Sequence, residues 1–143
     1  MQLEESLNFF ARLGLLRTEI NNWKSRPDLQ GRAQAHAPKK SYALGVNWSI
    51  TDRASLSLDV LGKSSFYYSD SHNNQSKSYS LTNINFDYLI GQWTYSIWAR
   101  NIFDEYYSVR GFYFGNEAPE FKDTLYERHG DPRHLGLSAR YDF

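Results

Sequence analysis

The residues INFDYLIGQWTYSIWA (84–99) give the clearest indication of the fold, because two runs of alternating apolar and polar residues flank Gly91-Gln92. Side chains two positions apart share one face of a strand, so each run has one apolar face. Glycine supplies the positive φ of a type II′ turn, and the two runs are predicted to pair as a hairpin in which Ile90 faces Trp93. The further pairs are Tyr88 with Tyr95, Phe86 with Ile97 and Ile84 with Ala99 on the apolar face, and Asp87 with Ser96 and Asn83 with Arg100 on the polar face.

A second hairpin is predicted upstream from the same alternation. The run SYALGVNWSIT (41–51) places Tyr42 and every second residue as far as Ile50 on one face. The next run begins at Ala54 and carries its apolar face to Phe66 and Tyr68. A loop over 51–53 makes Ile50 and Ala54 partners, so the two apolar faces coincide.

Two more strands are expected near the ends of the chain. Residues 1–20 fit a helix or a strand, and a strand over 7–20 is expected. The final residues HLGLSARYDF (134–143) alternate up to Phe143, and chain ends fray unless they are paired. Short loops at 51–53 and 91–92 alternate with long polar ones at 21–40, 69–77 and 103–133. The chain is therefore predicted to be one all-β domain, an antiparallel meander of about six strands.

The distribution of aromatic residues indicates what the apolar face contacts. Aromatic residues are 17% of the chain, and on the apolar face they gather near the two ends of the strands. Those near the short turns are Trp48, Tyr88, Trp93, Tyr95, Tyr141 and Phe143, and those near the long loops are Tyr42, Phe66 and Tyr68. The polar face carries Asp59, Lys63, Asn83, Asn85, Asp87, Arg100, His134 and Arg140. Aromatic belts around an aliphatic band, with a polar opposite face, are typical of a transmembrane β-barrel with a hydrated lumen.

Charge and composition exclude several other classes. The 16 Lys and Arg residues balance 16 Asp and Glu residues, so no nucleic-acid partner is expected. The chain has no cysteine, and it has no apolar run long enough for a transmembrane helix. Its first residues carry Glu4 and Glu5 where a signal peptide would carry basic residues, so no signal peptide is expected.

Three segments, in this order, carry a resemblance to a known family. They are GRAQAHAPKKSYALG (31–45), with Ala37-Pro38 ahead of an alternating strand, WTYSIWARNIFDEYYSVRGFYFG (93–115), and Pro132-Arg133 ahead of the final strand that ends in Phe143. Together they resemble the C-terminal part of TonB-dependent outer-membrane receptors. The resemblance extends over essentially the whole chain.

The resemblance implies that residues 1–143 are the last six strands of a barrel of about 22 strands, without its plug domain and signal peptide. It implies energy-coupled uptake of a scarce ligand such as a ferric siderophore, with the TonB complex contacting only the missing N-terminal part. The implied location is the outer membrane of a Gram-negative bacterium, once the chain is joined to an exported upstream part. The implied partners are outer-membrane lipid, the missing upstream barrel and plug, and the barrel assembly machinery. The residues implied as the assembly signal are Leu135, Leu137, Ala139, Tyr141 and Phe143.

Candidate ligand-binding residues lie in the long loop over 104–134. Aromatic rings and guanidinium groups there could hold an anionic, conjugated ligand such as a ferric siderophore, although such residues also pack loops against one another. The candidates are Tyr106, Tyr107, Arg110, Tyr113, Phe114 and Arg128.

No catalytic or metal site is predicted. His129 and His134, with Asp131 between them, lack a third ligand, and no nucleophile motif or phosphate-binding glycine loop is present. The chain is not expected to be an enzyme or to hold a cofactor. The alternative function is a soluble binding module, a β-sandwich or small barrel that uses the long-loop edge as its site. That alternative requires protein to cover the apolar face between Tyr42 and Ile50.

Overall fold

The computed structural model describes residues 6–143, which form eight β-strands and one short 3-10 helix. Glu4 and Glu5, on which the expectation about a signal peptide rests, lie outside the described residues. None of the helical structure in residues 6–143 is long and apolar enough to cross a membrane. The elements are β1 (Ser6–Leu15), η1 (Pro27–Leu29), β2 (Lys40–Thr51), β3 (Ala54–Lys63), β4 (Tyr79–Ile90), β5 (Trp93–Arg100), β6 (Ser108–Phe114), β7 (Thr124–His129) and β8 (His134–Tyr141).

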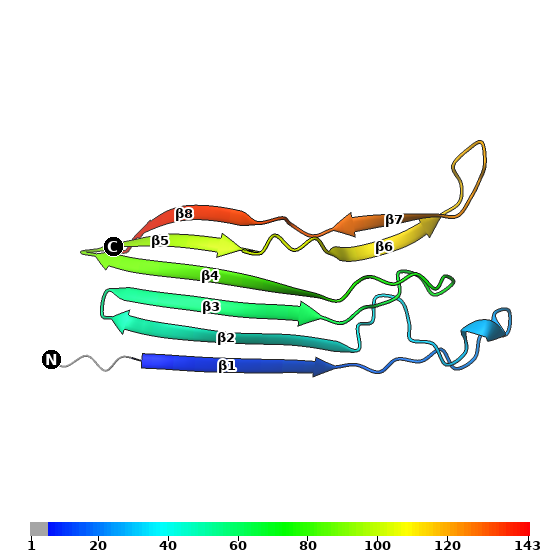
Figure 1. Cartoon of the computed structure of the whole chain (residues 1–143), viewed down its shortest axis with the longest axis horizontal. Helices are drawn as coiled ribbons and strands as arrows, with labels where there is room; N and C mark the ends of the chain where they lie inside the picture. The colour runs from blue at the N-terminus through cyan, green and yellow to red at the C-terminus, as the bar shows by residue number, and fades with distance from the viewer. Residues whose placement is uncertain (1–5) are drawn as a thin grey trace.

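In the described part of the chain, six strands make one antiparallel sheet in the order β1-β2-β3-β4-β5-β8. The all-β meander is therefore confirmed. Figure 1 shows the short turns, the start of β1 and the C-terminus at one end of the sheet and the long loops at the other. Strands β6 and β7 form a separate hairpin that extends beyond the loop end of β5 and β8. The long polar connection predicted over 103–133 contains β6 and β7, two strands that the prediction omitted. A register shift between Ser108 and Arg110 interrupts the alternation by which the hairpin could have been recognised.

The β4–β5 hairpin has the predicted register. Ile90 faces Trp93, and the pairing continues to Ile84 opposite Ala99. Gly91 has the expected positive φ, +61°. The predicted pair of Asn83 with Arg100 is wrong, because the side chain of Asn83 accepts a hydrogen bond from the backbone N–H of Asn101 at 3.1 Å and donates one to Asp59 at 2.8 Å.

The β2–β3 turn is tighter than predicted. Thr51 pairs with Ala54, and a bulge leaves Ile50 without a direct partner. The Thr51 hydroxyl accepts hydrogen bonds from the backbone N–H groups of Arg53 and Ala54, which closes a two-residue turn. The pair of Ile50 with Ala54 is therefore wrong. Trp48 still faces Leu56, so the two apolar faces coincide as predicted.

Strands β1 and β3 end earlier than predicted. β1 ends at Leu15 rather than at residue 20, because its partner β2 begins at Lys40, directly opposite Leu15. β3 ends at Lys63, and Phe66 and Tyr68 lie beyond it, only 6% and 5% exposed. Placing these two rings in an exposed aromatic belt was wrong, because the loops cover them.

The apolar face of the six-stranded sheet is exposed. Leu137, in the middle of β8, keeps 79% of its surface accessible. Other large apolar residues exposed on this face include Leu7, Phe9, Leu13, Leu44, Ile97 and Leu135. Within residues 6–143 no second sheet covers this face, and β1 does not pair with β8. The sheet formed by the described residues is open and one layer thick.

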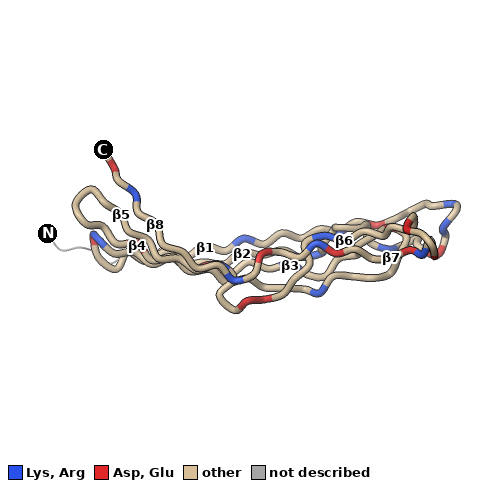
Figure 2. Tube along the Cα trace, turned by 90° about the horizontal axis from the view of Figure 1, so that it is seen from above, with Lys and Arg blue, Asp and Glu red and all other residues tan. Residues whose placement is uncertain are grey.

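Aromatic rings gather at the short-turn end as well as at the loop end, whereas charged residues concentrate at the loop end. At the short-turn end, the ring of Trp93 lies 5.1 Å from that of Tyr141, which in turn lies 5.1 Å from that of Phe143. Figure 2 shows Lys, Arg, Asp and Glu gathered mostly over the half that holds the long loops. This distribution matches an apolar band bordered by aromatic side chains at the short-turn end and by polar loops at the opposite end.

Candidate functional site

The long loops pack against one another at one end of the sheet (Figure 1). Among the described residues, the buried apolar side chains are Leu29, Phe66 and Tyr68, and all three belong to these loops. The ring of Tyr68 meets that of Phe66 edge-on, with centroids 5.8 Å apart. The buried apolar side chains of the described residues therefore lie at the loop end of the sheet. They can hold a binding surface there in a fixed shape.

A pocket of about 570 Å³ lies between the segment after β3 and the β6–β7 hairpin. Of the six predicted ligand-binding residues, Tyr106 and Tyr107 line it. The other lining residues are Tyr68, Gln75, Lys77, Ser108, Leu125, Glu127 and His129. The pocket therefore offers aromatic rings, an ammonium group, a carboxylate and an imidazole within one hollow.

Glu127 joins the two walls of the pocket. Its carboxylate accepts a hydrogen bond from the hydroxyl of Tyr68 at 2.9 Å and another from the hydroxyl of Ser108. The hydrogen bond from Ser108, and less strongly the one from Tyr68, hold the pKa of Glu127 below its usual value, against the opposing effect of burial. Burial raises the pKa of Tyr68. At neutral pH the pocket therefore contains a carboxylate and a phenol that stays protonated.

Two tyrosines before β6 have different surroundings. The ring of Tyr107 lies 4.5 Å from that of Tyr79 and directly over Gly130, where a Cβ would come within 2.0 Å of the ring. Tyr106 lies 4.3 Å from the ring of His129 and is 74% exposed. Tyr107 thus packs the loop against the sheet, whereas Tyr106 is free to contact a ligand.

The remaining predicted residues do not join the pocket. Tyr113 stacks on His72, with ring centroids 3.6 Å apart, on the same face of the hairpin as Glu127. Arg110 pairs with Arg128, and Phe114 shares their face, which is the opposite face of the hairpin. The six candidates are therefore divided between two faces, and the structure does not bring them together as one site.

Sequence reasoning missed several residues that line the pocket. Tyr68 had been assigned to an aromatic belt, and Lys77 and Glu127 were not selected. The alternation of Leu125, Glu127 and His129 along β7 was a usable signal that these three share a face. The hydrogen bond between Tyr68 and Glu127 spans 59 positions in the sequence, and no local pattern indicates it.

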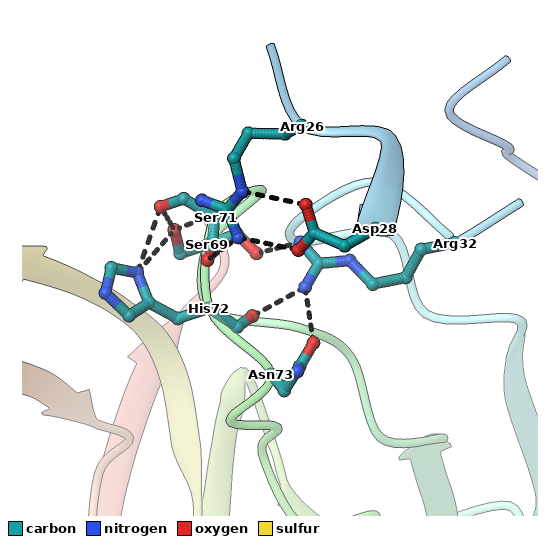
Figure 3. A network of polar contacts seen from close by, with 7 residues as sticks. All are labelled: Arg26, Asp28, Arg32, Ser69, Ser71, His72 and Asn73. Atoms are coloured by element: carbon teal, nitrogen blue, oxygen red, sulfur yellow. Dashed lines mark hydrogen bonds and ion pairs between the residues drawn. The ribbon is translucent and has the colours of Figure 1, made fainter. Parts of the chain in front are cut away.

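A network of arginines holds the segment after β3. The guanidinium of Arg32 donates to the backbone oxygens of Ser69 and His72, each at 2.7 Å, and to the side-chain oxygen of Asn73 at 3.0 Å. Arg26 donates to Asp28 at 2.9 Å and to the backbone oxygen of Ser71 at 3.2 Å (Figure 3). The hydrogen bond from Arg26 lowers the pKa of Asp28. Four hydrogen bonds from the two arginines thereby hold residues 69–73, and three of them go to backbone oxygens.

His72 connects that segment to the β6–β7 hairpin. Its Nδ1 lies 2.9 Å from the hydroxyl of Ser71, and its Nε2 lies 3.4 Å from a carboxylate oxygen of Asp123. Figure 3 shows His72 held by the serines on one side of the arginine network. The loop after η1, the segment after β3 and the tip of the hairpin therefore form one connected structure.

The residues weighed as metal ligands and as an assembly signal lie elsewhere. His134 faces Arg100 across β8 and β5, away from His129, whose ring lies beside Tyr106. Residues 6–143 contain no group of three or more His, Asp or Glu side chains arranged to hold a metal ion.

The residues predicted as an assembly signal lie on the apolar face of β8 and at the end of the chain. They are Leu135, Leu137, Ala139 and Tyr141, which lie opposite Ala99, Ile97, Tyr95 and Trp93, and the exposed Phe143, which follows them.

Comparisons with known proteins give a match among solved structures. No protein-family model matches the chain, and no curated protein matches it. Among solved structures, the siderophore receptor PiuA from Acinetobacter baumannii is similar, with a TM-score of 0.77 and 13% sequence identity over 96% of this chain. The match covers 20% of that receptor, so this chain spans about a fifth of its length. The fold of this chain is therefore that of part of a siderophore-receptor barrel.

Proposed function

We propose that residues 1–143 form the C-terminal portion of the barrel domain of a TonB-dependent outer-membrane receptor, with the plug domain and signal peptide outside this chain. The observation that carries this proposal is the exposed apolar face of an open, one-layer sheet whose fold is found in a siderophore receptor. The proposed function of the complete receptor is energy-coupled uptake of a scarce small ligand such as a ferric siderophore.

The exposed face has a physical explanation in a bilayer. Each Å² of apolar surface kept in water costs about 25 cal/mol, and this face exposes large side chains along β1, β5 and β8. Lipid chains remove that cost without a second layer of protein. The opposite face presents Asp59, Asn85 and Asp87, which suit a hydrated lumen.

The sheet edges explain why this chain needs further strands. In hydrocarbon an unpaired backbone N–H or C=O group costs several kcal/mol, and β1 and β8 each have one unpaired side in the described chain. Six strands are also fewer than the roughly eight of the smallest single-chain membrane barrels. We infer that strands upstream of residue 1 pair with β1 and, on closure of the barrel, with β8.

The loop-end pocket is the proposed ligand contact within this chain. Tyr106 offers an exposed ring for stacking and Lys77 a positive charge, while the arginine network and Glu127 hold the walls in place. Energy coupling requires the plug and the TonB complex, which act through the missing N-terminal part. The assembly machinery is proposed to recognise Leu135, Leu137, Ala139, Tyr141 and Phe143.

Two experiments test the proposed function. The DNA read in frame upstream of the Met1 codon is expected to encode further barrel strands, a plug domain and a signal peptide. Disruption of the gene is expected to lower uptake of radiolabelled iron supplied as a ferric siderophore to iron-starved cells. A stop codon directly upstream, with a soluble 143-residue product in the cells, would contradict the proposal.

A further inference from the structure

A second hollow, of about 460 Å³, lies at the loop end of the sheet. Leu13 faces Tyr42, Tyr42 faces Gly62, and Gly62 faces Ser80, so these residues form one row across four strands. Leu13, Tyr42 and Ser80 line the hollow. Directly paired residues share a face, and the neighbouring row on this face contains Leu44 and Val60. The hollow therefore opens on the apolar face.

Tyr42 forms the floor of this hollow. Its ring lies over Gly62, where a Cβ would come within 2.4 Å of the ring carbons. Its hydroxyl lies 2.5 Å from the hydroxyl of Ser80. Because Gly62 has no side chain, the ring of Tyr42 can lie across β3 and reach β4. The hollow is the space on the outer side of this ring.

The wall of the hollow nearest the loops is polar. Lys40 is two residues before Tyr42 on the same face of β2, and its backbone N–H donates to the hydroxyl of Ser64 at 3.1 Å. Ser64 and Ser78 also line the hollow. None of the ion pairs formed within residues 6–143 includes Lys40. Lys63 and Glu105 also line the hollow. Lys63 belongs to the row of Ser41 and Tyr79, on the opposite face of the sheet, so Lys40 is the lysine of the apolar face.

We propose that this hollow binds the anionic, phosphate-bearing head group of a membrane lipid. Lys40 and the serine hydroxyls supply the donors for phosphate oxygens, and Leu13, which is 69% exposed, lies beside the first part of the acyl chain. A free phosphate ion would not contact the apolar side of the hollow, and a zwitterionic lipid would gain less from the ammonium of Lys40 than an anionic lipid, because its own cationic group opposes the attraction. The inference rests on the proposed function, because lipid reaches this face only in a bilayer.

The test measures lipid selectivity of the complete receptor that contains this chain, reconstituted in phosphatidylcholine vesicles. The probes are spin-labelled phosphatidic acid and spin-labelled phosphatidylcholine, and the readout is the motionally restricted fraction of each. One lysine at a membrane surface favours an anionic lipid about fivefold. We expect that preference in the unmodified chain and a ratio near one in Lys40→Gln. Lys39→Gln removes the same charge one residue away, outside the hollow, and is expected to keep the preference.

Four outcomes would overturn the inference. Equal losses in Lys40→Gln and Lys39→Gln would show diffuse charge attraction, and competition by inorganic phosphate as strong as by the lipid would show a phosphate site. A complete receptor that inserts but has no preference for phosphatidic acid contradicts the lipid site and leaves the proposed function intact. A complete receptor that stays in the aqueous phase contradicts the proposed function and the lipid site together.

Discussion

Glu127 illustrates how single residues organise the loop end of this molecule. It lies on β7, yet both of its hydroxyl donors come from other segments, Tyr68 after β3 and Ser108 on β6. Because the carboxylate is the acceptor for both, its ionisation strengthens the docking of the hairpin. The structure therefore predicts a pH dependence for this part of the protein.

The first prediction concerns acid stability. The folded pKa of Glu127 lies below its unfolded value, so its stabilising effect is complete above the unfolded pKa and disappears as the pH falls through the folded pKa. Replacing Glu127 with Gln should cost about 0.5–1 kcal/mol at pH 7, since the side chain is partly solvated, and almost nothing at strongly acidic pH. Thermal unfolding followed by circular dichroism at both pH values checks this. An equal cost at the two pH values would contradict the role of the carboxylate.

A second prediction separates the two faces of the hairpin. Tyr106→Ala should weaken binding of a ferric catecholate complex about fivefold, because it removes an exposed stacking ring worth about 1 kcal/mol. Phe112→Ala is the matched control, since Phe112 is also exposed but lies on the face away from Glu127. Quenching of tryptophan fluorescence in the complete receptor measures both affinities. A larger loss of affinity in Phe112→Ala than in Tyr106→Ala would show that the ligand binds the other face of the hairpin.

At the scale of elements, alternation predicted the strands whose partners are close in the sequence. The turn at Gly91 and the pairs from Ile90 to Ile84 follow from period two and from the φ that glycine allows. The β6–β7 hairpin was missed because its bulge shifts the period within a strand of seven residues. The pocket was missed for another reason: its walls come from segments that meet only after folding, and local patterns carry no information about such contacts.

The arginine network gives a prediction about one of these segments. Arg32→Lys should remove at least two of the three hydrogen bonds to 69–73, because an ammonium group cannot reproduce the planar fork of the guanidinium. The backbone N–H groups of Tyr68 and Ser76, which are bonded within this segment, should then exchange with solvent about tenfold faster.

Arg17→Lys is the control for that measurement. Arg17 is highly exposed and its ion pair with Glu19 spans 3.7 Å. Hydrogen exchange followed by mass spectrometry should show no change at Tyr68 and Ser76 in this variant. Equal exchange in Arg32→Lys and the unmodified protein would mean that the network does not hold the segment.

The whole molecule is an open sheet with one apolar and one polar face, and its stability depends on what lies against each. Substituting Leu58 with Lys should cost about 2–4 kcal/mol in a bilayer, because Leu58 lies in the middle of the apolar face. Ser57→Lys, one residue away on the polar face, should cost less than about 1 kcal/mol. Urea unfolding of the complete barrel in lipid vesicles compares the two variants. Similar costs would contradict the assignment of faces.

The most direct test of the lipid-facing sheet uses the fact that the chain contains no cysteine. Leu58→Cys and Ser57→Cys each introduce a single thiol, on opposite faces of β3. In outer membranes that hold the complete protein, a charged, membrane-impermeant maleimide is expected to label Ser57→Cys through the hydrated lumen. A lipid-soluble maleimide is expected to label Leu58→Cys, which the charged reagent does not reach. Rapid labelling of Leu58→Cys by the charged reagent would show that water contacts the apolar face and would contradict the account.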